Sequence, residues 1–151
     1  MLLRLDKVSN GHVYNVELAE NTPNGAIVEK GGYLAFDYYE GKKVANIDAE
    51  LLLLATPFMD KSGLEDEATF TLKKGEMGRG YGLIKGDMIT MTIDGITGAT
   101  AVSADMVDKF AVPEVGSFNL KIDAVKSGSL AFEVKAVEQI NGQDALVLEV
   151  K

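Results

Sequence analysis

Short segments in which apolar and polar side chains alternate recur along the chain, separated by turn-forming residues. The clearest is MITMTI at 88–93, where the residues at 89, 91 and 93 are apolar and two threonines lie between them. A period of two is the pattern of a half-buried β-strand. Similar alternation at 118–122, 130–134 and 145–150, with Asn141-Gly142 as a hairpin signal, predicts an all-β fold, a compact β-barrel or β-sandwich.

One apolar run does not alternate. Residues 51–54 are four consecutive leucines, preceded by Asp48 and followed by Pro57. Asp48 could cap a short helix that Pro57 ends, but the run has no amphipathic period. A strand buried on both faces accounts for it about as well, and we favour the strand for residues 48–56. The only other helical signal is at 103–109, where Ser103 could cap a single turn, so we expect at most one short helix.

Glycines suggest turns in the segment 21–43. The sequence NTPNGAIVEKGGYLAFDYYEGKK places Gly31-Gly32 between two β-favouring runs and Gly41 after the second of them. We therefore predict a turn at Gly31-Gly32 and another at Gly41.

The stretch GEMGRGYGLIKGDM at 75–88 invites a phosphate-binding interpretation. It fails the Walker spacing, because Lys85 precedes Gly86 and Asp87 follows it. It also fails the dinucleotide fingerprint, whose last glycine would fall on Leu83. We interpret it as a bent strand entering a tight turn, in which the residues that matter for shape are Gly78, Gly80, Gly82, Gly86 and Asp87.

Composition and charge narrow the range of partners. The 151 residues are 46% hydrophobic and 25% charged, and 15 basic against 23 acidic residues give a net charge of −8. This balance argues against nucleic acid and anionic membranes as partners, because both are bound mainly by basic side chains. The start of the chain lacks the apolar region of a signal peptide, and the longest apolar run is far too short for a membrane span.

The sequence offers few residues that could carry out catalysis or bind a metal ion. The chain has no cysteine and one histidine, His12, so a multi-histidine or thiolate metal site is excluded. We expect no catalytic residues, no cofactor and no metal. Tyr14, Tyr33, Tyr38 and Tyr39 could line a carbohydrate-binding platform, although aromatic residues of strands more often pack in the core.

The order of segments resembles a known family. An Asn-Gly pair near the start is followed by GAIVEKGGYLAF, LLLLATP, KKGEMGRGYGLIKGDMITMTID and a closing FEVKAVEQINGQDALVLEV. This outline is similar to the head-decoration, or auxiliary, proteins of tailed phages. The resemblance implies a non-enzymatic virion structural protein that is made in the host cytoplasm, binds the outside of a capsid shell through the major capsid protein, and stabilises it.

The start of the chain suggests where such binding would occur. Residues 1–10 are either a docking arm or an edge strand, and residues 11–151 form a single β domain. The docking candidates are Leu2, Leu3, Arg4 and Leu5. If they form an arm, removing residues 1–6 should leave the fold intact. The alternatives are a carbohydrate- or ligand-binding β module and a phage tail-tube or baseplate component; the sequence leaves a homo-oligomer open.

Overall fold

The protein is all-β, as predicted. The computed structural model describes residues 1–9, 12–58 and 66–151, so the Asn10-Gly11 pair lies outside the described residues. Its helical content within those ranges is two 3-10 turns, η1 (Ile93–Gly95) and η2 (Ala104–Met106). The Ser103 hydroxyl caps η2 by accepting a hydrogen bond from the Asp105 N–H, so the cap predicted for this turn is confirmed.

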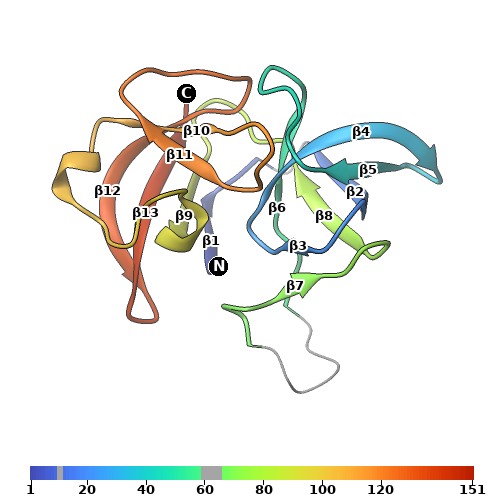
Figure 1. The fold of residues 1–151 in the computed structure, drawn as a ribbon, viewed down its shortest axis with the longest axis horizontal. Coiled ribbons are helices and arrows are strands. Elements are labelled where there is room, and N and C mark those ends of the chain that lie inside the picture. Colours follow the sequence, from blue (N-terminus) through green and yellow to red (C-terminus); the bar gives the residue numbers. More distant parts are fainter. Residues whose placement is uncertain (10–11, 59–65) are drawn as a thin grey trace.

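Two main sheets lie side by side (Figure 1). The first is antiparallel throughout, in the order β1 (Leu3–Lys7), β9 (Met88–Thr92), β13 (Gln143–Val150), β12 (Phe132–Ile140), β10 (Phe110–Pro113) and β11 (Leu120–Asp123). The second closes into a barrel, in the order β2 (Val13–Leu18), β5 (Tyr38–Lys42), β4 (Ile27–Ala35), β6 (Leu51–Leu54) and β8 (Met77–Tyr81). The short pair β3 (Thr22–Pro23) and β7 (Thr71–Leu72) lies beside the barrel.

The four-leucine run forms β6, a strand that is buried on both faces. Leu52 and Leu54 belong to the core inside the barrel, together with Val16 and Val28. Leu51 and Leu53 belong to a second core, which the barrel shares with the six-stranded sheet. Because successive side chains of a strand point to opposite faces, four apolar residues in a row suit a strand that lies between two cores.

The turns predicted at Gly31-Gly32 and Gly41 are wrong. Gly31 and Gly32 lie within β4, where the register with β5 is irregular, and Gly41 lies within β5. A β-carbon at Gly31 would lie 3.0 Å from Glu40 Cβ, so this glycine permits close approach of two strands. The chain instead reverses at Phe36-Asp37, between the paired residues Ala35 and Tyr38.

The hairpin predicted at Asn141-Gly142 is confirmed. Ile140 pairs with Gln143, so the loop consists of these two residues, and both have positive φ, +50° for Asn141 and +79° for Gly142. Asn-Gly suits this turn because neither residue is strongly penalised in the left-handed region.

A buried carboxylate joins β4 to the segment after β5. Glu29 accepts hydrogen bonds from the backbone N–H groups of Ala45 (3.1 Å) and Asn46 (2.9 Å) and pairs with Lys42. Burial by itself raises the pKa of Glu29, but these bonds outweigh burial and hold the pKa below its ordinary value.

Candidate functional site

The first two residues are held by the protein's own core. Leu2 is 4% exposed, and its N–H donates a hydrogen bond to the Thr92 hydroxyl at 2.8 Å. The side chain of Met1 is buried in the core between the two sheets, and its ammonium group lies 3.2 Å from the Asp94 carboxylate. Leu2 is therefore available to a partner only if the start of the chain leaves its place.

The other docking candidates lie on β1, the outer strand of the six-stranded sheet. Leu5 is 39% exposed, whereas Leu3 packs partly against the core. The Arg4 guanidinium lies 2.5 Å from Asp6 and 2.7 Å from Glu138, and its hydrogen bonds to these carboxylates raise its pKa. Arg4 thus ties the edge strand to β12 across the sheet.

A surface groove of about 230 Å³ runs beside β1. Leu3 and Leu5 line its β1 side, and Phe58 and Tyr81 contribute aromatic surface across from them. Within the described residues, β1 is paired with a strand only on its β9 side. Polar side chains, among them Thr56, Glu67 and Arg79, also line the groove, so its surface is mixed. An edge strand with a groove beside it is the arrangement in which a partner strand adds to a sheet and places a side chain in a pocket.

The glycines of β8 leave room inside the narrow barrel. A β-carbon at Gly78 would lie 2.7 Å from Leu54 Cδ1, and one at Gly80 would lie 2.9 Å from Leu52 Cδ1. A β-carbon at Gly82, just after β8, would lie 3.1 Å from His12 Cβ. Inside the barrel, β8 thus contributes almost no side-chain volume, whereas the neighbouring β6 contributes leucines.

Gly86 and Asp87 form the turn that leads into β9. Gly86 has φ +94°, a conformation that side chains with a β-carbon rarely adopt. The buried Asp87 carboxylate accepts hydrogen bonds from the N–H groups of Ile84 (3.0 Å) and Ser9 (3.2 Å). Asp87 therefore fixes this turn and connects it to the end of β1.

A lysine lies between two tyrosine rings at one end of the barrel. Lys30 is in phase with the buried Val28 on β4, and its Nζ lies 4.4 Å from the Tyr14 ring centre and 4.3 Å from that of Tyr39. The same Nζ lies 2.5 Å from the Glu50 carboxylate. Burial lowers the pKa of Lys30, but Glu50 and the two tyrosines outweigh this and raise it, so the ammonium group stays charged.

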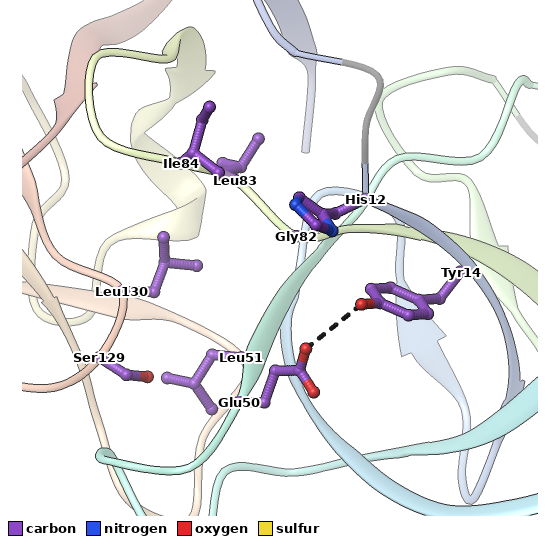
Figure 2. A pocket seen from close by; sticks show the side chains of 9 residues that line it. All are labelled: His12, Tyr14, Glu50, Leu51, Gly82, Leu83, Ile84, Ser129 and Leu130. Carbon is purple, nitrogen blue, oxygen red and sulfur yellow. Dashed lines mark hydrogen bonds between the residues drawn. The ribbon is translucent and has the colours of Figure 1, made fainter.

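A cleft of about 280 Å³ opens beside this cluster (Figure 2). It is lined by His12, Tyr14, Glu50, Leu51, Gly82, Leu83, Ile84, Ser129 and Leu130. Figure 2 shows the Tyr14 hydroxyl directed at the Glu50 carboxylate, at 3.5 Å. The cleft offers a ligand the exposed imidazole of His12 and one tyrosine hydroxyl, whereas Glu50 is already neutralised by Lys30.

The structure brings together three of the four tyrosines considered for a carbohydrate-binding platform. Tyr39 makes edge-on contacts with both Tyr14 and Tyr33, each at 5.6 Å between ring centres. Lys30 covers one face of Tyr14 and Tyr39, which leaves Tyr33 as the most exposed ring of the cluster. Sequence reasoning missed Lys30, because its partners Tyr14, Tyr39 and Glu50 come from other segments of the chain.

Comparisons with models of protein families, with curated proteins and with solved structures find no match for this chain. Among the described residues, no three His, Asp or Glu side chains are placed to hold a metal ion. No helix in the described ranges has the length and apolarity needed to cross a membrane.

Proposed function

We propose that this chain is a non-enzymatic virion structural protein that binds the outside of a phage capsid shell and stabilises it. Its partner is the major capsid protein, and its place is the capsid surface after synthesis in the host cytoplasm. Binding at many equivalent positions of a shell would add avidity to a modest individual contact.

The observation that carries the proposal is the position of β1. This strand lies at the edge of a sheet, offers the exposed side chain of Leu5, and has beside it a groove lined by both apolar and polar side chains. Such an edge is suited to pairing with a strand of another protein. The order of segments, which resembles that of phage head-decoration proteins, supports a capsid subunit as that protein.

Binding to capsid shells that lack the protein tests the proposal. Leu5→Ser removes the exposed apolar side chain of β1, and Val137→Ser is its matched control, because Val137 is 38% exposed and lies on β12 of the same sheet. We expect the wild type to bind shells and raise their melting temperature. Leu5→Ser should bind about tenfold more weakly, the effect of about 1.4 kcal/mol, and Val137→Ser should bind like the wild type.

Other outcomes would redirect the assignment. A wild-type protein that leaves shells unbound and no more heat-resistant would refute the proposal. Attachment to purified tail tubes or baseplates would indicate the tail component considered from the sequence. Binding on a glycan array that is lost in Tyr39→Ala would favour the ligand-binding module instead.

A further inference from the structure

The tip of the β4–β5 hairpin presents a group of exposed apolar side chains. The hairpin extends from the barrel at the side far from β12 and β13 (Figure 1). Phe36, at its turn, is 91% exposed, and Tyr33 and Leu34 on the preceding strand are also exposed. Single exposed apolar residues are ordinary, but a group of three that includes two aromatic rings is typical of an interaction site.

The conformation of Phe36 costs free energy. Phe36 and Asp37 have φ of +49° and +64°, the same left-handed pattern that Asn141 and Gly142 adopt in the other two-residue hairpin. Among the residues that the structure describes, this turn thus occurs once with the favoured Asn-Gly pair and once with a bulky aromatic residue in a position that disfavours it. A residue that is disfavoured by the backbone conformation of its own turn indicates a role beyond folding.

The hairpin is stiffened behind its tip. The Tyr33 ring packs edge-on against Tyr39, which packs against Tyr14 and Lys30. The Asp37 N–H also donates a hydrogen bond to the Tyr33 hydroxyl at 3.4 Å. A surface that is already ordered loses less conformational entropy on binding.

The surroundings of the tip are acidic. Asp37 is part of the turn, and Glu17 and Glu40 line a surface hollow together with Leu34. Lys74 lines the same hollow, but among the described residues no ion pair joins these three carboxylates to a basic side chain. A partner with an apolar pocket and lysine or arginine side chains around it would match this surface.

We propose that the β4–β5 tip is a second docking surface, which inserts Phe36 into an apolar pocket of the capsid protein that basic side chains surround. This inference rests on the proposed function and adds to it the surface and the chemistry of the partner site. A second copy of this chain is a poorer match, because its net charge of −8 would repel the acidic tip. An anionic membrane is disfavoured for the same reason.

Phe36→Asn tests this inference without disturbing the turn, because asparagine tolerates positive φ. Val125→Asn is the control, since Val125 is 68% exposed and lies outside the hairpin. We expect Phe36→Asn to fold normally and to bind empty capsid shells about 30-fold more weakly, the loss typical of a central aromatic anchor. Val125→Asn should bind like the wild type. The salt dependence of binding should be smaller in Asp37→Asn/Glu40→Gln than in the wild type.

The outcomes separate this inference from the proposed function. If the wild type binds shells and Phe36→Asn binds equally well, the hairpin inference fails and the proposed function stands. If the wild type does not bind shells, both fail. If sedimentation shows that the wild type is a dimer and that Phe36→Asn is a monomer, the inference would be overturned in favour of self-association. Binding to phosphatidylcholine–phosphatidylglycerol vesicles that Phe36→Asn abolishes would overturn it in favour of a membrane.

Discussion

Replacing Gly80 by alanine should destabilise the barrel, although alanine usually costs less stability than glycine inside a strand. The new β-carbon would lie 2.9 Å from Leu52 Cδ1 and 3.3 Å from Leu52 Cβ. Carbon atoms in contact normally lie about 3.5 Å or more apart, so the nearest pair must separate by about 0.6 Å. Leu52 is fully buried inside a closed barrel and has little room to move.

The expected loss follows from two opposing effects. Overpacking a core typically costs about 1–3 kcal/mol. Alanine also restricts the unfolded chain, and this stabilises the folded protein by about 0.4–1 kcal/mol. We therefore expect Gly80→Ala to lower the free energy of unfolding by about 1–2 kcal/mol. At about 2–4 °C per kcal/mol for a chain of this size, the melting temperature should fall by about 2–8 °C.

Urea and thermal unfolding followed by circular dichroism would measure this change, since the chain has no tryptophan. Gly32→Ala is the matched control, because Gly32 is also within a strand but a β-carbon added there would meet no atom of a more distant residue within 4 Å. With no clash to offset the restriction of the unfolded chain, it should leave stability unchanged or raise it by up to about 1 kcal/mol. Leu52→Val removes the colliding atom, so the double variant should be more stable than the sum of the single effects by about 0.5 kcal/mol or more. A Gly80→Ala protein as stable as the wild type would refute the reasoning.

Three further predictions concern stability. Burial raises the pKa of Glu29, but its hydrogen bonds lower the pKa by more, so the folded value lies below the ordinary value of 4.5. The stabilisation from Glu29 should therefore be present above pH 4.5 and be lost as the pH falls through the folded pKa. In urea titrations at several pH values, Glu29→Gln should lack this acid-dependent loss. Phe36→Asn should raise the free energy of unfolding by about 0.5–1 kcal/mol, because it relieves strain at positive φ, and an unchanged or lower melting temperature would contradict this. Removing residues 1–6 should lower the free energy of unfolding by about 3 kcal/mol or more, because Met1 and Leu2 are both buried. A truncated protein that melts like the wild type would instead favour the docking arm over the edge strand.

Part of the proposed surface could be read from the sequence. Leu5 was a docking candidate because an apolar first segment needs something to cover it, and the structure places this residue at an exposed edge. Leu2 was a candidate for the same reason, yet it is covered by the protein itself. The hairpin tip was not identified, because the two glycines at Gly31-Gly32 gave a stronger turn signal than Phe36-Asp37.

The sequence by itself determined the features that depend on neighbouring residues. Alternation predicted the all-β fold, the Asn141-Gly142 pair predicted its hairpin, and the failed spacing of the glycine-rich stretch argued against a phosphate loop. Each of these follows from backbone sterics or side-chain period over a few residues.

Only the tertiary structure decided how the strands are joined. The barrel closes partly through the parallel pairing of β2 with β5, which no local pattern specifies. Closure brings Lys30 between Tyr14 and Tyr39 and makes β8 present glycines to the leucines of β6. These contacts join residues far apart in the chain, and their free energy exists only after the strands have paired, so local sequence preferences contain no record of them.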